Sequence, residues 1–400
     1  MKRGKTLWKT LVSASAVLTL AAGVITPVLA DGTGTSTTTT ASGSEIVPDG
    51  GFTKTYKVVS ALAQTDATNP KETFTFSTGD LVDIQNSEYS VTKAPEKIPE
   101  TIKHIFIGKN TDTDNKTDNV TFEKGTATVD GATAPISIQA SINNYDRPGV
   151  YYYNFNENDG KTAGVTYSAD TYQVILPVVY EDGKLKFGTA YVKDITTENT
   201  PKVKTIVNEY RAGSLEVNKS VAGNLGDRDK AFTITVTLKA PDGKTVRSDM
   251  KLKVTNAPGK NEVRVDNSVL TASTDTTGTY YTISAKDSAG NNEWTSKTIT
   301  FKVKDGSSYK LVNVPAGVTY TVSEEESNGY TTTIEYPKTT DGKPNTTMDA
   351  TEQVVNITNT KDTTLDTGVF LNNMPYIALV AVAAVALVFF MKNQKHQEQE

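Results

Sequence analysis

The stretch LEVNKSV, residues 215–221, has the alternating pattern of a β-strand. Leu215, Val217 and Val221 share one face, because successive side chains of a strand point to opposite sides. Lys219 lies on that same apolar face. An edge lysine that prevents unwanted pairing, or one whose stem bends toward water, is the ordinary explanation. The stretch therefore predicts a strand and leaves open whether Lys219 has a buried role.

Two other segments of the same half of the chain place polar residues on apolar strand faces. In GVTYTVSE (317–324), Glu324 follows Val318, Tyr320 and Val322 on one face. In VVNITNT (354–360), Asn359 shares a face with Val355 and Ile357. The second half of the chain thus carries the order lysine, glutamate, asparagine, each on an apolar strand face.

The same order occurs in the first half of the chain. FTKTYKV (52–58) places Lys54 between Phe52 and Tyr56, whereas Lys57 falls on the opposite face and is the less favoured alternative. Glu157 ends the apolar face of GVYYYNFNE, and Asn208 lies on the apolar face of KTIVNEY. A repeated set of three is harder to explain by chance than a single buried lysine.

Burying a lysine, a glutamate and an asparagine without partners costs several kcal/mol. Burial lowers the pKa of an amine and raises that of a carboxyl group, so a neutral amine beside a protonated acid is favoured. Such an amine can attack the asparagine carboxamide while the acid assists, which expels ammonia and leaves an amide bond. Hydrogen-bonded buried networks that do not react are the alternative.

Most of the chain between residues 50 and 361 is strand-like, with segments such as TYQVILPVVY and AFTITVTL. Turn signals separate the segments, including EDGK, PDGK and KDGS. Many short strands with frequent turns predict an all-β protein made of antiparallel sandwiches.

Composition excludes several classes of chemistry. The chain has no cysteine, so disulfides and thiolate catalysis are excluded. His104 and His396 are the only histidines, which argues against a histidine-based triad, a zinc site and therefore a secreted hydrolase. The net charge of −5 makes nucleic acid an unexpected partner. No cofactor is expected.

The acidic segment TDTDNKTDN (111–119) has residues at the offsets of a calcium-binding loop. Lys116 occupies a ligand position, and Thr117 occupies the position of the turn glycine. A solvated loop without metal is therefore expected. The residues concerned are Asp112, Asp114, Lys116, Thr117, Asp118 and Glu123.

Both ends of the chain carry apolar segments. Residues 1–30 begin with basic residues, continue as an apolar run and end in Val28-Leu29-Ala30, as in a secretory signal peptide. Residues 31–49 are rich in threonine, serine and glycine and are expected to form a flexible leader. Residues 374–391 are expected to form a transmembrane helix, with a basic cytoplasmic tail at 392–400.

In combination, several segments resemble the two-domain shaft pilins of streptococci, the T-antigen type. That resemblance implies two tandem immunoglobulin-like domains, at 50–212 and 213–361, each joined by an internal isopeptide bond. Carried over to this chain, the bonds are Lys54–Asn208, assisted by Glu157, and Lys219–Asn359, assisted by Glu324. The segments that carry the resemblance are RPGVYYYNFNE, GVTYSADTYQV, SLEVNKSVAG, GDRDKAF, PAGVTYTVSE and NTKDTTLDTGV.

The segment at 362–373 resembles a sortase sorting signal placed before an apolar span and a basic tail. Only Thr367 and Gly368 match the usual Leu-Pro-any-Thr-Gly form strictly, and the proline is missing. Cleavage is expected after Thr367. The aligned pentapeptide is Thr364, Leu365, Asp366, Thr367 and Gly368.

In shaft pilins a lysine of the next subunit accepts the cleaved end. NTPKVKTIVNEY offers Lys202, with Lys204 and Lys193 as alternatives. Lys204 would share the face of Ile206 and Asn208 and is expected to point inward.

The resemblance implies a structural protein and no enzyme: the shaft subunit of a covalent pilus on a Gram-positive cell wall, held at the membrane before sortase acts. The implied partners are a pilin-specific sortase, identical subunits, ancillary pilins and peptidoglycan, with host surface ligands left open. A wall-anchored monomeric adhesin or an ancillary tip pilin is the alternative.

Overall fold

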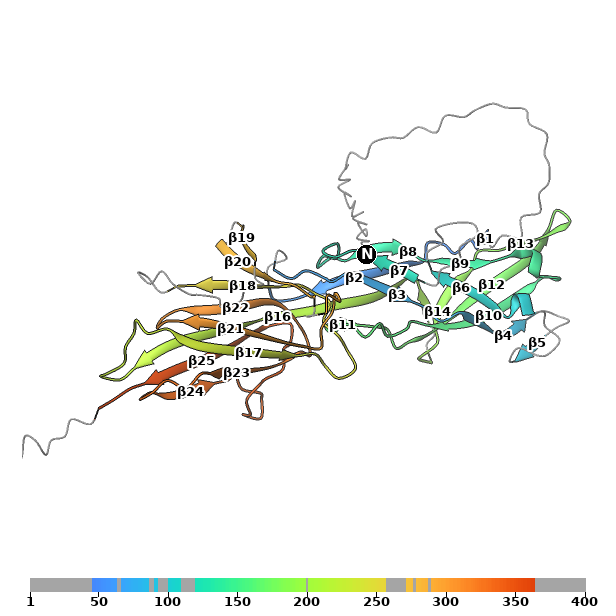
Figure 1. Ribbon diagram of the computed structural model, residues 1–400. Coiled ribbons are helices and arrows are strands. Elements are labelled where there is room, and N and C mark those ends of the chain that lie inside the picture. The colour runs from blue at the N-terminus through green and yellow to red at the C-terminus, as the bar shows by residue number, and fades with distance from the viewer. Residues whose placement is uncertain are drawn as a thin grey trace, which may run out of the picture. The chain divides into compact units, whose positions relative to one another are not determined.

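The computed structural model describes residues 45–62, 66–85, 90–92, 100–108, 119–198, 201–256, 271–275, 278–286 and 289–363 (Figure 1). The expected signal peptide, sorting pentapeptide, transmembrane helix and tail lie outside these residues and remain predictions. Within the described part of the chain, none of the helices has the length and hydrophobicity needed to cross a membrane.

The described residues form β-sheets with two short 3-10 helices, so the expected all-β class is confirmed. The elements up to residue 203 are β1 (Glu45–Ile46), β2 (Thr53–Val59), β3 (Glu72–Thr75), β4 (Gly79–Gln85), β5 (Ser90–Thr92), η1 (Glu100–Ile102), β6 (His104–Gly108), β7 (Asn119–Phe122), β8 (Ala132–Pro135), β9 (Ser137–Ala140), η2 (Ile142–Asn144), β10 (Gly149–Asn156), β11 (Val165–Thr166), β12 (Thr171–Glu181), β13 (Lys184–Phe187), β14 (Tyr191–Asp194) and β15 (Lys202–Val203).

The remaining strands begin with one long strand, β16, which belongs to two sheet regions. They are β16 (Thr205–Ala222), β17 (Phe232–Lys239), β18 (Met250–Thr255), β19 (Thr271–Asp275), β20 (Gly278–Ile283), β21 (Ser296–Val303), β22 (Ser308–Pro315), β23 (Thr319–Glu324), β24 (Thr331–Glu335) and β25 (Glu352–Thr360).

Strand β16 is 18 residues long and changes partners along its length. Its first half pairs with β2 and β11, and its second half pairs with β22 and β25. A second sheet faces each half of β16. The sheet that faces the first half has the strand order β1-β9-β6-β4-β10-β12-β14-β15, and the sheet that faces the second half has the order β21-β17-β23. One continuous strand therefore contributes to two sandwiches.

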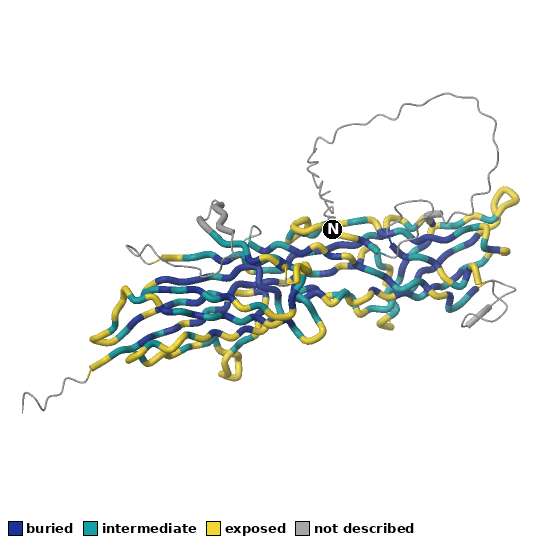
Figure 2. The backbone as a smooth tube through the Cα atoms, in the orientation of Figure 1, coloured by how far each residue is buried: buried dark blue, intermediate teal, exposed yellow. Residues whose placement is uncertain are grey.

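Each sandwich has its own buried core (Figure 2). The first core contains Tyr56, Phe74, Tyr151 and Phe155 among its large side chains, and the second contains Phe301 and Tyr309. Burial of apolar surface contributes about 25 cal/mol per Å², so aromatic side chains of this size supply much of the driving force.

The three expected turns are confirmed, and glycine is required in each. Gly183, Gly243 and Gly306 all have positive φ angles, of 77°, 71° and 74°. Residues with a Cβ avoid this region, whereas glycine enters it without steric cost. Asp182 also has a positive φ, of 52°, which is typical of the tight hairpin turn between β12 and β13.

The prediction that the flexible leader extends to residue 49 is wrong. Residues 45 and 46 form β1, which pairs with β9, and Val47 is fully buried in the first core. The two apolar residues Ile46 and Val47 follow a long polar run, so the average composition of residues 31–49 does not indicate that they are buried. The folded region therefore begins before residue 50.

Candidate functional site

The structure brings together Lys54, Glu157 and Asn208 in the core of the first sandwich. Lys54 Nζ donates to Glu157 Oε1 at 2.5 Å and also contacts Asn208 Oδ1. Asn208 Nδ2 donates to Glu157 Oε2 at 3.0 Å, which closes a triangle of three side chains. The side chains of Lys54 and Glu157 are both fully buried.

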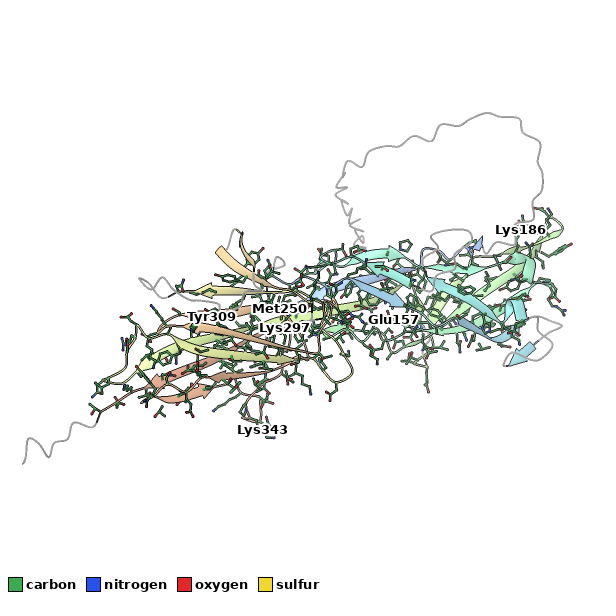
Figure 3. The ribbon with its side chains drawn as sticks, in the orientation of Figure 1. Glu157, Lys186, Met250, Lys297, Tyr309 and Lys343 are labelled. Carbon is green, nitrogen blue, oxygen red and sulfur yellow. The ribbon has the colours of Figure 1, made fainter. Side chains whose placement is uncertain are left out.

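Strand pairing explains how the triangle forms. Strands β2 and β16 run parallel, with Lys54 opposite Ile206, so that Asn208 lies two residues further along β16 on the same face. Glu157 directly follows β10, which belongs to the facing sheet. Figure 3 labels Glu157 among the strands of this sandwich. The acid thus approaches the lysine and the asparagine from across the core.

The second sandwich assembles Lys219, Glu324 and Asn359 in the same way. Lys219 Nζ donates to Asn359 Oδ1 at 2.5 Å and lies 3.0 Å from Glu324 Oε2. Asn359 Nδ2 donates to Glu324 Oε1. The side chains of Lys219 and Glu324 are 0% and 1% exposed.

The register of the second site repeats that of the first. Strands β16 and β25 run parallel, with Lys219 opposite Ile357, so that Asn359 again lies two residues further along the partner strand. Glu324 ends β23, which belongs to the facing sheet. Two segments separated by 140 residues therefore meet with the same geometry as two separated by 154.

Burial changes the protonation of both lysines. Desolvation lowers the pKa of Lys54 from 10.5 to about 8, although the adjacent Glu157 carboxyl opposes this shift. Desolvation also lowers the pKa of Lys219, opposed by Glu324. Phe74 and Phe232 contribute to the apolar surroundings, with ring centroids 4.5 and 4.3 Å from the two Nζ atoms. Both amines are closer to the neutral, nucleophilic form than an exposed lysine.

Main-chain groups that the sequence did not indicate complete the first site. The Thr166 carbonyl accepts a hydrogen bond from Asn208 Nδ2 at 2.9 Å, and the Ser168 N–H donates to Glu157 Oε2 at 2.8 Å. Both residues lie in GVTYSADTYQV, which marks the family resemblance. Because the contacts use backbone atoms, no side-chain type at these positions could have revealed them.

The three lysines considered as acceptors lie in β14, in β15 and directly before β16. Lys202 is exposed in β15, and its Nζ lies 4.2 Å from the centroid of the Tyr191 ring. Lys193 is half-buried and pairs with Lys202 across β14 and β15. The expectation that Lys204 points inward is wrong, because Lys204 precedes β16 and is exposed.

Comparisons with known proteins found a matching family model and several similar proteins. A family model described as "Domain of unknown function (DUF7601)" matches residues 213–276 and 262–361. The chain is similar to a pilin. That relative, from Streptococcus pyogenes serotype M1, is 28% identical over 261 residues, which cover 62% of this chain and 69% of the pilin.

A second relative is the pilus tip adhesin Cpa of Streptococcus pyogenes, 24% identical over 229 residues. The match covers 54% of this chain but only 28% of the adhesin. Among solved structures, the major pilin of Streptococcus pyogenes matches with a TM-score of 0.44 and 22% identity, over 78% of this chain and 98% of the pilin.

Proposed function

We propose that this chain is the shaft subunit of a sortase-assembled covalent pilus on a Gram-positive cell wall, and that each of its two domains, 50–212 and 213–361 by sequence, is stabilised by a self-formed amide bond. The observation that carries the proposal is the duplicated site: lysine, asparagine and glutamate, buried in each sandwich with the same strand register. Similarity to a streptococcal pilin supports the pilus assignment.

The proposed reaction follows from the contacts in the first site. Lys54 passes one proton to Glu157 along their 2.5 Å contact, and the neutral amine attacks Asn208 Cγ. The new Nζ–Cγ bond replaces the Cγ–Nδ2 bond. Of the three Nζ hydrogens, one stays on the carboxyl group, one departs with Nδ2 as ammonia, and one remains on the amide. The buried ion pair is thereby removed.

The sites react once and in cis, so the chain performs no turnover. Each bond joins the parallel strand pair that closes its sandwich, β2 with β16 or β16 with β25. By analogy with disulfides, closing a loop of this length restricts the unfolded chain by about 4–5 kcal/mol. In a fibre under tension, the joined strands would resist extension of the domain.

The direct test is the intact mass of recombinant residues 31–362. We expect a mass lower than the sequence mass by two molecules of ammonia, one for each domain. Peptide mapping should recover branched peptides joining Lys54 to Asn208 and Lys219 to Asn359. A mass equal to that of the sequence would contradict the proposal.

The lowered pKa of Lys54 predicts a pH-dependent stability in a variant that cannot form the first bond. In Asn208→Ala the folded state loses the Lys54 proton near pH 8, whereas the unfolded chain holds it to about pH 10.5. Between these values the unfolded state binds more protons, so the free energy of unfolding should rise with pH, by up to about 1.4 kcal/mol per unit.

The matched control is Lys54→Met, which also lacks the bond but has no amine. Chemical denaturation of the first domain from pH 7 to 10 should show Asn208→Ala gaining stability relative to Lys54→Met above about pH 8. A difference that stays constant with pH would show that Lys54 is not desolvated in the unreacted fold.

A monomeric wall-anchored adhesin or a tip pilin is the second candidate, favoured by the similarity to a pilus tip adhesin over 54% of the chain. Both candidates include the two internal bonds. They differ in whether copies of this chain are joined to one another.

A further inference from the structure

The carboxamide of Asn208 is fixed by two acceptors on different elements. Its Nδ2 atom donates to Glu157 Oε2 at 3.0 Å and to the Thr166 carbonyl at 2.9 Å. Both amide hydrogens are therefore engaged, which fixes the plane of the carboxamide. Its Oδ1 atom faces Lys54.

The carboxyl group of the first site is also held by the segment that follows β11. The Ser168 N–H donates to Glu157 Oε2 at 2.8 Å, so Oε1 is left facing Lys54 Nζ. Pairing of β11 with β16, with Thr166 opposite Glu209, places this segment beside Asn208. The backbone ladder thus orients both the acid and the amide.

The second site lacks this support among the described residues. Asn359 Nδ2 donates to Glu324 Oε1, and no second acceptor among the described residues lies within hydrogen-bond distance of it. Glu324 Oε2 lies 3.0 Å from Lys219 Nζ, and no backbone N–H of the described residues donates to it. Among the described residues, Thr332 Oγ1 also donates to this carboxyl group, at 3.4 Å from Oε1.

A further acidic residue acts on the amine of the second site. The turn at 305–307 bonds to the backbone of Lys219 on both sides, and its Asp305 Oδ1 accepts from the Val221 N–H at 2.7 Å. The Asp305 side chain is 20% exposed, and its charge favours the protonated form of Lys219. In the first site, the acid whose charge raises the pKa of Lys54 is Glu157, the assisting acid itself.

We infer that the Thr166 carbonyl and the Ser168 N–H are positioning groups for bond formation in the first domain, and that the first bond therefore forms faster than the second. The inference rests on the proposed function. Holding the attacked carbon and the assisting acid in one arrangement lowers the entropic part of the barrier, because fewer conformations must be lost before attack. In the second domain the amide and the acid must find that arrangement by side-chain motion.

The test follows both bonds in one molecule. The full chain is synthesised in a cell-free extract, samples are quenched in acid and denaturant at intervals, and the branched peptides of the two sites are quantified after digestion. We expect the Lys54–Asn208 peptide to appear with a half-time at least ten times shorter than that of the Lys219–Asn359 peptide.

Two variants at one position isolate the backbone donor. Ser168→Pro removes the N–H and should slow the first bond at least tenfold, with the second bond as an internal reference. Ser168→Ala keeps the N–H and loses the hydroxyl contacts to Asp170 and Tyr172, so its first bond should form at least tenfold faster than that of Ser168→Pro.

Equal half-times in the unaltered chain would overturn the inference, as would a folded Ser168→Pro chain whose first bond forms at the unaltered rate. If Ser168→Pro does not fold, the ratio of half-times in the unaltered chain still decides. Absence of both branched peptides would contradict the proposed function itself.

Discussion

Glu324→Gln should abolish the second bond while leaving the first intact, so the variant should be heavier than the unaltered protein by one ammonia, less the small mass change of the substitution. Glutamine keeps the size of the side chain but cannot accept the Lys219 proton along the 3.0 Å contact. Without that transfer the amine stays charged and does not attack Asn359.

Loss of this bond should destabilise the second domain strongly. Residues 219 and 359 enclose a loop of 140 residues, for which the disulfide analogy gives about 5 kcal/mol. For a domain of this size, that corresponds to a fall of about 10–20 °C in Tm. Calorimetry and timed proteolysis should show the change in the second domain, while the first domain keeps its behaviour.

The matched control is Glu325→Gln, because Glu325 is the adjacent glutamate and is exposed. It should leave both bonds and both transitions unaltered. If Glu324→Gln still lacks two ammonia masses, Glu324 is not the assisting acid. The equivalent pair of experiments at Glu157 tests the first domain.

Lys202→Arg should remove high-mass ladders from cell-wall extracts of the native host, while both internal bonds and the fold persist. We propose that Thr367 of one subunit is joined to Lys202 of the next by the sortase that reads residues 364–368. Transfer of an acyl group needs an accessible amine, and Lys202 is exposed at the start of β15. Arginine keeps the charge but stays protonated and cannot take its place.

Lys204→Arg and Lys193→Arg are the comparison variants. Both residues lie near Lys202, Lys204 being exposed and Lys193 half-buried, so neither substitution should disturb the fold. Ladders that persist in Lys202→Arg but vanish in Lys204→Arg would move the joining site by two residues. An unaltered protein that forms no ladders in its own host would favour the monomeric adhesin or tip pilin.

The sequence by itself determined which faces of the strands are buried. Side chains alternate along a strand, so the apolar neighbours of Lys54, Glu157 and Asn208 were enough to place each of them in a core. The same period predicted the faces of Lys219 and Asn359, and glycine in the three turn signals predicted the turns. These are local properties, which is why they could be read without knowing the partner strands.

Only the tertiary structure decided how those faces meet. The parallel pairing of β2 and of β25 with β16, in registers that bring each asparagine to its lysine, joins segments far apart in the sequence. Local patterning does not encode such a register, because a shift by two residues would keep every side chain on the same face.

Exposure at the ends of strands was also decided by the fold. The alternation that buries Ile206 and Asn208 would bury Lys204, yet Lys204 is exposed because β16 begins only at Thr205. Val47 is buried because β1 pairs with β9, although its flanking sequence is polar. The contacts of Thr166 and Ser168 use backbone atoms, which every residue possesses, so only the three-dimensional arrangement distinguishes these two positions.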